Sequence, residues 1–231
     1  MEILPEIEII GLSLWLDKSK TLIFSDFHLG YEETLREKGF FLPKTQFQDV
    51  LQEVKFILNK VKPKQIIING DLKHEFSKIL SQEWKDVLRL IDFLLENCEE
   101  LIIVKGNHDR FLRPIAGKRE IKVVEDFQVD DILICHGDKI KETAAKTIII
   151  GHEHPAIVLK ELGKVEKFKC FLLGKWKKKD LIVMPSFNPI LEGTDILKEE
   201  LLSPYLEDIS DFKVYVVGEE IYDFGKLKNL S

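Results

Sequence analysis

The chain of 231 residues contains 45% hydrophobic and 32% charged residues, a composition typical of a soluble globular protein that excludes a disordered or fibrous chain. Its formal net charge of -6 gives no overall attraction for nucleic acid or anionic lipid, so an anionic substrate has to be attracted by a local feature. Uninterrupted apolar runs are far shorter than the roughly 20 residues that span a bilayer, and the chain lacks a basic signal start, so we expect no membrane association.

The cysteines indicate a reducing compartment. Cys98, Cys135 and Cys170 are an odd number and have no metal-binding spacing. Such a set argues against a disulfide framework. We therefore expect a cytoplasmic protein.

The first half of the chain alternates short apolar runs with stretches of helical periodicity. Runs at residues 21–24, 65–68 and 101–104 predict buried strands. Between them, residues 43–61 and 81–97 carry apolar side chains at helical spacing. This alternation predicts a parallel sheet with right-handed crossovers.

After residue 120 the predicted strands are joined by short turns, which favours antiparallel pairing. These expected strands cover residues 122–129, 156–160, 169–176, 181–185 and 213–224, and the apolar runs at residues 132–135 and 147–150 predict further buried strands. No repeat or flexible linker separates the two halves, so we predict one domain over residues 1–231 without a separate cap domain. Its predicted fold class is α/β, with two packed mixed sheets flanked by helices.

All six histidines lie beside Asp, Asn or Gly, at or just past the end of an apolar run. The blocks are Asp26-Phe27-His28, Gly70-Asp71-Leu72-Lys73-His74, Gly106-Asn107-His108-Asp109, His136-Gly137-Asp138 and Gly151-His152-Glu153-His154. A lone histidine is usually structural, but six in this arrangement indicate metal ligands. Because open α/β sheets bind ligands beyond the carboxyl ends of their strands, one rim could collect all of these side chains.

Spacing within two blocks suggests how the ligands are presented. In an extended segment residues i and i+2 point the same way, so Asp26 and His28 would lie on one side, as would His152 and His154. The residues between them should face away. The neighbouring glycines could let the backbone approach a metal closely, or could be ordinary turn residues.

These blocks, in this order, resemble the five signatures of the calcineurin-like metallophosphoesterase superfamily over residues 24–154. Three segments also resemble the ICC-like predicted phosphoesterase branch, of the archaeal type related to bacterial ligase-associated phosphoesterases. They are Asp26-Phe27-His28-Leu29-Gly30-Tyr31-Glu32, Leu42-Pro43-Lys44-Thr45-Gln46 and Pro185-Ser186-Phe187-Asn188-Pro189. The resemblance implies the αββα four-layer metallophosphoesterase sandwich.

The same resemblance implies a site for two divalent metal ions, with Asp71 bridging them. One ion would be held by Asp26, His28, Asp71 and His154, and the other by Asp71, Asn107, His136 and His152. A set rich in imidazole and free of thiolate favours Mn²⁺ and also suits Fe, Zn²⁺ or Ni²⁺. The two ions would supply the local positive charge that attracts phosphate.

The reaction implied is hydrolysis of phosphodiester bonds by attack of a hydroxide shared between the ions. His108 would assist the leaving oxygen, and Asp109 could orient His108. His74 resembles a substrate-side histidine of nuclease relatives, or alternatively makes a supporting hydrogen bond within its loop.

Two basic regions are candidates for substrate binding. Arg110, Arg113 and Arg119 could grip the non-scissile part of the substrate, because their forked groups match phosphate geometry, or could lie on a solvated helix face. Residues 164–180 carry an excess of lysine that could follow a nucleic-acid backbone, although a β-hairpin with a solvated turn is the more expected structure.

Aromatic residues near the blocks are expected to pack in the core or in loops, although any that line the rim could stack on a base. The residues concerned are Phe40, Phe41, Phe76 and Phe111.

Three functions compete on this basis. A phosphodiesterase, and in particular a nuclease acting on DNA or RNA, leads; a phosphodiesterase or phosphatase for small nucleotides is the alternative. A non-catalytic scaffold, like the retromer subunit of similar fold, is less expected because such relatives lose ligands, whereas every position is filled here. The expected partner is a phosphodiester substrate, with nucleic acid included and membranes excluded; the sequence gives no oligomeric state.

Overall fold

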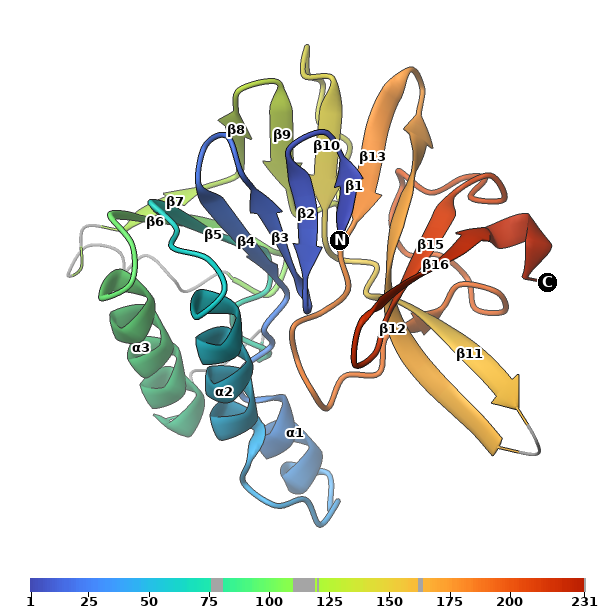
Figure 1. Ribbon diagram of the computed structural model, residues 1–231. Coiled ribbons are helices and arrows are strands. Elements are labelled where there is room, and N and C mark those ends of the chain that lie inside the picture. Colours follow the sequence, from blue (N-terminus) through green and yellow to red (C-terminus); the bar gives the residue numbers. More distant parts are fainter. Residues whose placement is uncertain (76–80, 110–118, 120, 162–163, 231) are drawn as a thin grey trace.

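The computed structural model describes residues 1–75, 81–109, 119, 121–161 and 164–230. Two mixed sheets pack face to face, with helices on the outer face of one of them (Figure 1). The predicted α/β class with two packed sheets is therefore confirmed. The prediction of one domain over residues 1–231 without a cap stays a prediction.

The first sheet has seven strands in the order β1-β2-β3-β4-β5-β6-β7. They are β1 (Glu2–Leu4), β2 (Ile7–Ile10), β3 (Ser13–Leu16), β4 (Thr21–Ser25), β5 (Gln65–Asn69), β6 (Glu100–Val104) and β7 (Lys122–Val124). Strands β4 to β7 are parallel, as predicted. The antiparallel strands β1 to β3 were not predicted; each has only three or four residues, too few for a recognisable period.

The second sheet has nine strands, of which β14-β11-β12-β13-β10-β9-β8 form a continuous path. They are β8 (Asp126–Val129), β9 (Ile132–Cys135), β10 (Thr147–Ile150), β11 (Pro155–Glu161), β12 (Lys164–Trp176), β13 (Lys179–Val183), β14 (Thr194–Asp195), β15 (Lys213–Val217) and β16 (Ile221–Lys226). Pairing along β11, β12, β15 and β16 is antiparallel, as predicted.

Two expectations about this half of the chain were wrong. Strand β10 pairs in parallel with both β9 and β13, because the chain crosses over between these strands instead of turning back in a hairpin. The strand predicted over residues 122–129 is interrupted at Glu125 and contributes β7 to the first sheet and β8 to the second.

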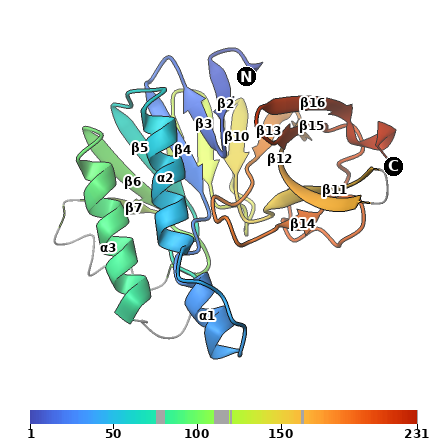
Figure 2. The ribbon, with the colours of Figure 1, turned by 60° about the horizontal axis from the view of Figure 1, so that its bottom comes forward.

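The helices and the strands enclose three hydrophobic layers. Helices α2 (Gln46–Leu58) and α3 (Ser81–Leu95) cover the outer face of the first sheet, whereas α1 (Tyr31–Glu37) projects beyond it (Figure 2). On β5, Ile66 and Ile68 pack under the helices, and Ile67 packs between the sheets. The outer face of the second sheet is covered by side chains from the segment 196–212 and, near the C-terminus, by the short 3₁₀ helix η1 (Leu227–Asn229).

This arrangement gathers the ends of several strands on one rim. Ser25 at the end of β4 is paired in register with Asn69 at the end of β5, which is paired with Val104 of β6. Ile150 of β10 is paired with Val183 of β13 in the second sheet. Within the part of the chain that the structure describes, no helix is long and apolar enough to cross a membrane.

Candidate metal centre

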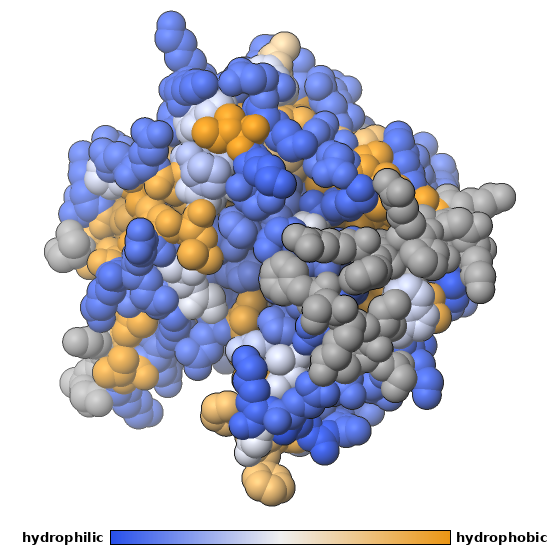
Figure 3. Space-filling model, turned by 180° about the vertical axis from the view of Figure 1, so that it is seen from behind, coloured by the Kyte–Doolittle hydropathy of each residue, from blue (hydrophilic) through white to orange (hydrophobic). Residues whose placement is uncertain are grey.

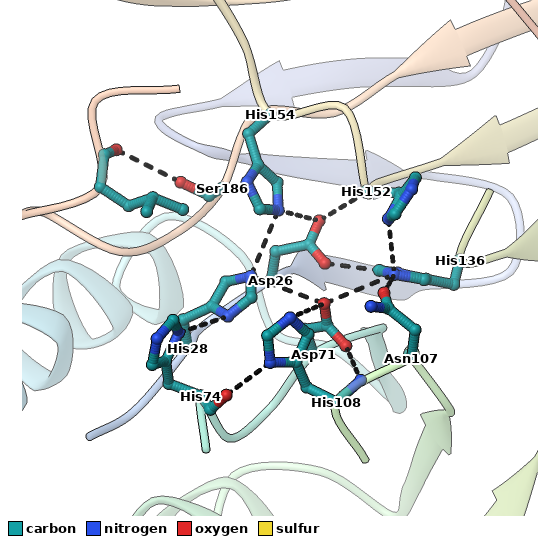
Figure 4. A network of polar contacts seen from close by, with 12 residues as sticks. Asp26, His28, Asp71, His74, Asn107, His108, His136, His152, His154 and Ser186 are labelled. Atoms are coloured by element: carbon teal, nitrogen blue, oxygen red, sulfur yellow. Dashed lines mark hydrogen bonds and ion pairs between the residues drawn. The ribbon is translucent and has the colours of Figure 1, made fainter. Parts of the chain in front are cut away.

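All six histidines gather with Asp26, Asp71 and Asn107 at the carboxyl ends of strands from both sheets (Figure 4). The first sheet contributes residues that follow β4, β5 and β6, and the second contributes residues that follow β9 and β10. All seven residues predicted as metal ligands lie in this cluster: Asp26, His28, Asp71, Asn107, His136, His152 and His154. Their roles as ligands remain a prediction.

One group of donor atoms surrounds the end of β4. His154 Nε2 lies 3.5 Å from Asp26 Oδ2 and 3.3 Å from His28 Nε2. Asp71 Oδ2 lies 3.6 Å from His28 Nε2. Two donors that bind one ion at about 2.0–2.2 Å lie roughly 3–3.5 Å apart, so this spacing fits a shared divalent cation. We refer to Asp26, His28 and His154 as the first donor set.

A second group of donor atoms adjoins the first. His136 Nε2 lies 2.8 Å from Asn107 Oδ1, 3.1 Å from His152 Nδ1 and 3.5 Å from Asp71 Oδ2. We refer to Asn107, His136 and His152 as the second donor set. The same oxygen, Asp71 Oδ2, thus borders both sets, which is the arrangement that a bridging carboxylate requires.

Three glycines of the sequence blocks make room for this cluster. A Cβ atom at Gly106 would lie 2.0 Å from Asp71 Oδ1, and one at Gly151 would lie 2.2 Å from Asp26 Oδ2. A Cβ at Gly70 would lie similarly close to an imidazole nitrogen. Because no side chain fits at these distances, the glycines are required by close approach and are not merely turn residues.

The backbone at four of the ligands is left-handed. The φ angles are 52° at Asp26, 42° at His28, 62° at His152 and 50° at His154. The expected extended alternation in these blocks was therefore wrong, although each pair still presents both side chains to the cluster. Non-glycine residues in this region are strained, and such strain persists only where surrounding contacts enforce it.

The residues between the paired ligands face away from the cluster, as predicted. Phe27 is fully buried and packs against Phe24 and Phe187 at ring-centroid distances of 5.6 Å and 5.0 Å. Glu153 is also fully buried and accepts hydrogen bonds from the backbone N–H groups of residues 202 and 203. Each block is thus anchored from behind.

Two side chains from distant segments hold the backbone beside the first donor set. Asn188 Nδ2 donates to the carbonyl oxygens of Phe27 and His28, both at 3.0 Å. Gln46 Nε2 donates to the same His28 carbonyl at 2.9 Å. Both side chains are buried. We call Asn188 and Gln46 the brace. Its residues lie in the segments 42–46 and 185–189, whose resemblance to the ICC-like branch implies no role for them.

Further contacts fix the brace itself. Glu32 Oε2 accepts hydrogen bonds from the backbone N–H groups of Thr45 and Gln46, each at 2.9 Å. Lys169 Nζ donates to the Ser186 carbonyl at 2.7 Å and also to the Asn188 carbonyl. Burial lowers the pKa of Lys169 to about 7, which indicates how far this ammonium group is removed from water.

The electrostatics of the cluster call for a cation. Burial, together with repulsion from Asp26 and Asp109, raises the pKa of Asp71 to about 9. Burial also lowers the pKa of His136 to about 4, and it lowers the pKa of His28 well below its usual value. Neutral imidazoles offer free nitrogen lone pairs, and a divalent ion would remove the repulsion between the carboxyl groups. The residues therefore fit the ions that the sequence resemblance implies.

Asp26 remains the ionised carboxyl group of the cluster. Burial alone would raise its pKa, but the interaction with His154, which includes a hydrogen bond to the carboxylate, lowers it below the usual range. Asp26 Oδ2 accepts hydrogen bonds from the Ser25 hydroxyl at 2.6 Å and from the His152 backbone N–H at 3.0 Å. These contacts orient the carboxylate within the first donor set.

His108 lies beside Asp71. Its backbone N–H donates to Asp71 Oδ1 at 2.8 Å, and its Nε2 lies 3.8 Å from Asp71 Oδ2. Its Nδ1 contacts the carbonyl oxygen of His74, which favours a proton on Nδ1 and directs Nε2 toward the cluster. The imidazole is thus held in one orientation.

His74 and Asp109, both predicted as catalytic residues, contact the framework of the site. His74 Nδ1 lies 3.3 Å from His28 Nδ1, so it can orient that ligand, in agreement with the alternative of a supporting hydrogen bond. The Asp109 carboxylate accepts from the backbone N–H groups of Gly106 and Leu72, at 3.0 Å and 3.1 Å, and so joins two loops of the site.

The remaining candidates contribute less. Arg110 and Arg113, predicted to bind substrate, lie outside the described residues, as do Phe76 and Phe111. Arg119 Nη2 donates to Asp92 Oδ2 of α3 at 3.0 Å, which fits a helix face and not a phosphate grip. Strands β12 and β13 form the hairpin expected from the lysine-rich region 164–180.

Phe40 and Phe41, expected to pack in the core or in loops, are instead exposed, with 59% and 105% of their surface accessible. They follow α1, where Figure 3 shows hydrophobic residues at the lower end of a mainly hydrophilic face. The expectation of packing was therefore wrong for these two residues, because the segment between α1 and α2 projects away from both sheets.

The family described as calcineurin-like phosphoesterase matches residues 19–220. No curated protein sequence matches the chain. The nuclease MPE of Pseudomonas putida has a TM-score of 0.70 to this chain, with 17% identity over 94% of each chain. At that identity the similarity shows the fold alone.

Two further solved structures are more distant. A predicted phosphoesterase from Streptococcus pneumoniae is 17% identical, covers 87% of this chain and 91% of its own, and has a TM-score of 0.37. Vps29 from Entamoeba histolytica, solved with Zn²⁺, is 16% identical, covers 89% of this chain and 99% of its own, and has a TM-score of 0.36.

Proposed function

The chain belongs to the calcineurin-like phosphoesterase family, and from that premise we propose that it is a two-metal phosphodiesterase that cleaves DNA or RNA. The observation that carries this proposal is the position of Asp71 Oδ2, which lies 3.6 Å from His28 Nε2 and 3.5 Å from His136 Nε2. One carboxylate oxygen between two donor sets is suited to two ions and not to one.

Asp26, His28 and His154 would hold one ion, Asn107, His136 and His152 the other, and Asp71 both. When bound, a pair of divalent ions supplies Lewis acidity for the phosphoryl oxygens and lowers the pKa of water. We favour Mn²⁺, because four imidazoles, two carboxylates and an amide suit a borderline ion better than Mg²⁺. Fe, Zn²⁺ and Ni²⁺ suit the same set.

His108 is the residue that we propose as proton donor. When the bond between phosphorus and the leaving oxygen breaks, that oxygen takes a proton from His108 Nε2, while Nδ1 stays bonded to the His74 carbonyl. Donation from Nε2 requires the doubly protonated imidazole; because burial lowers the pKa of His108, this form is the less populated one but the stronger acid. The His74 carbonyl keeps the ring oriented, and the His74 ring orients His28.

One consideration favours nucleic acid as the substrate, and another favours an enzyme over a scaffold. The nuclease MPE of Pseudomonas putida shares this fold over nearly its whole length. The family relationship and a complete ligand set argue against a non-catalytic scaffold. The alternative is a phosphodiesterase or phosphatase for small nucleotides, and a comparison of substrates distinguishes it from a nuclease.

A screen of metals against substrates tests the proposal. Protein stripped of metal and reloaded with each divalent ion is assayed on bis(4-nitrophenyl) phosphate, 4-nitrophenyl phosphate, cyclic nucleotides, and single- and double-stranded DNA and RNA. We expect diester hydrolysis, including that of nucleic acid, to exceed monoester hydrolysis. A preference for the monoester, or cleavage of small nucleotides alone, would favour the alternative.

A further inference from the structure

A pocket of about 410 Å³ lies directly beside the candidate metal centre. Its lining includes Asn107 and His136, which belong to the second donor set. Figure 4 shows these two side chains on one side of Asp71 and His74 on the other. A substrate held at the metal centre would therefore extend into this pocket on the side away from His74.

The pocket is lined by lysine side chains as well as by residues of the second donor set. Lys105, Lys139 and Lys141 line it, together with the acidic residues Asp109, Glu125 and Asp138, so a lysine is available to an anion only where its carboxylate partner can be displaced. Among the described residues that line the pocket there is no Phe, Tyr or Trp, and its one aromatic ring is the imidazole of His136. Its positive groups suit a phosphate better than a nucleobase.

Lys105, which lies two residues before Asn107 of the second donor set, forms an ion pair that a substrate could replace. Lys105 Nζ lies 2.6 Å from Glu125 Oε1, and 68% of the Glu125 side chain is exposed. An exposed ion pair of this kind contributes little to stability, because solvent screens it. An incoming phosphate could therefore replace the Glu125 carboxylate at Lys105 at low cost.

Another lysine of the pocket wall, Lys141, is held in place by the fold. The Lys141 backbone N–H donates to the Tyr205 hydroxyl at 2.7 Å, and Lys141 Nζ lies 3.1 Å from Asp126 Oδ2. Tyr205 itself is buried in the core of the second sheet. This part of the wall is thus fixed by the fold, whereas the ion pair of Lys105 and Glu125 can open. We call Lys105 and Glu125 the adjustable pair.

We propose that this pocket is a subsite for a second phosphate of the substrate, adjacent to the scissile one, with Lys105 as its main contact. The proposal rests on the proposed function and deepens it, because an oligonucleotide carries consecutive phosphodiesters and so presents a second phosphate next to the scissile one. Glu125 competes with the substrate for Lys105 and so weakens binding of short chains.

Binding measurements test this subsite independently of turnover. The probes are a fluorescein-labelled thymidine pentanucleotide with hydrolysis-resistant phosphorothioate linkages and a labelled thymidine dinucleotide with one such linkage. Fluorescence anisotropy with the Mn²⁺-loaded protein gives the Kd of each probe. Lys146→Gln is the matched control, since Lys146 forms a similar exposed pair, 2.6 Å from Asp131, just before β10 and so at the opposite end of that strand from the site.

The two residues of the adjustable pair should act in opposite directions. We expect Lys105→Gln to raise the Kd of the pentanucleotide roughly five- to tenfold and to reduce its salt dependence, as loss of one phosphate contact does. Glu125→Gln should lower that Kd by about two- to fivefold. The Kd of the dinucleotide, which has only one phosphate, should stay within about twofold in both variants.

Equal effects of Lys105→Gln on both probes, or no effect on either, would overturn the subsite. If Lys146→Gln raised the Kd of both probes as much as Lys105→Gln does, the effect would come from general electrostatics and not from a subsite. Failure of the proposed function has a different signature: no metal-loaded form of the wild-type protein would hydrolyse bis(4-nitrophenyl) phosphate, whatever the binding data show.

Discussion

The two halves of the candidate metal centre are held in different ways. All three residues of the first donor set, Asp26, His28 and His154, lie on left-handed backbone, which the second set shows only at His152, and their loop is braced from behind by Asn188 and Gln46. The second donor set adjoins a pocket of about 410 Å³ whose polar lining includes exposed ion pairs. One half of the candidate site is held by a network of buried hydrogen bonds, whereas the other opens onto a pocket.

This difference follows from what surrounds each half. The first donor set lies where β4, α2 and the segment after β13 meet, so three parts of the chain can supply hydrogen bonds to one short loop. The second donor set borders the change from one sheet to the other at Glu125, between β7 and β8. Asp71 joins the halves, and changes at Asp71 should therefore affect both.

Removal of metal gives the largest expected effect, because it disables both halves at once. Dialysis against a chelator should abolish diester hydrolysis, and Mn²⁺ should restore it better than Mg²⁺. Hydrolysis of bis(4-nitrophenyl) phosphate before and after reloading measures this. Full activity in excess chelator would refute the metal mechanism.

His108→Ala should separate chemistry from metal binding in both halves. All seven donor residues remain, so metal content should be unchanged, whereas turnover of an oligonucleotide should fall by roughly 10² to 10⁴, the range of a positioned general acid. Bis(4-nitrophenyl) phosphate should lose less, because nitrophenolate leaves without a proton. Equal large losses on both substrates would instead assign His108 to stabilisation of phosphoryl charge.

Asn188→Ala should affect the first half alone. Without its hydrogen bonds to the carbonyls of Phe27 and His28, the strained loop loses part of its support, and affinity for one of the two ions should fall about 10- to 100-fold. Titration of the metal-free protein with Mn²⁺ should show one weakened and one unchanged site. Asn59→Ala, at an exposed asparagine after α2, is the matched control, and equal weakening of both sites would argue against a brace confined to the first half.

A change at Phe41, in the exposed segment 38–45, should have the smallest effect on stability and metal content. Phe41 lies between α1 and Gln46, but its surface is 105% accessible, so Phe41→Ser should change the free energy of unfolding by less than about 0.5 kcal/mol. Metal content should also stay the same, since the Gln46 contact does not involve this side chain. Denaturant unfolding and elemental analysis check both; loss of metal would mean that the whole segment 38–45, and not Gln46 alone, supports the first half.

The sequence predicted which residues come together in both donor sets but not the way they are held. Strand ends and histidine blocks located Asp71, His136 and the other donors, because the carboxyl ends of parallel strands meet on one rim whatever the local backbone does. The left-handed conformation of His28 and the contacts of Asn188 depend on segments about 160 residues apart, for which a single sequence gives no pairing signal. Chain direction in β10 was missed for the same reason.

The most direct test of the two-metal account is the metal content of Asp71→Asn. Burial and repulsion raise the pKa of Asp71 to about 9, so the metal-free wild type already carries a neutral side chain there at pH 7, and the variant should fold with closely similar stability when no metal is present. In the presence of Mn²⁺ at a concentration that fills two sites in the wild type, elemental analysis should find fewer than one ion per chain in the variant. Two tightly bound ions in Asp71→Asn would contradict the bridge between the two donor sets.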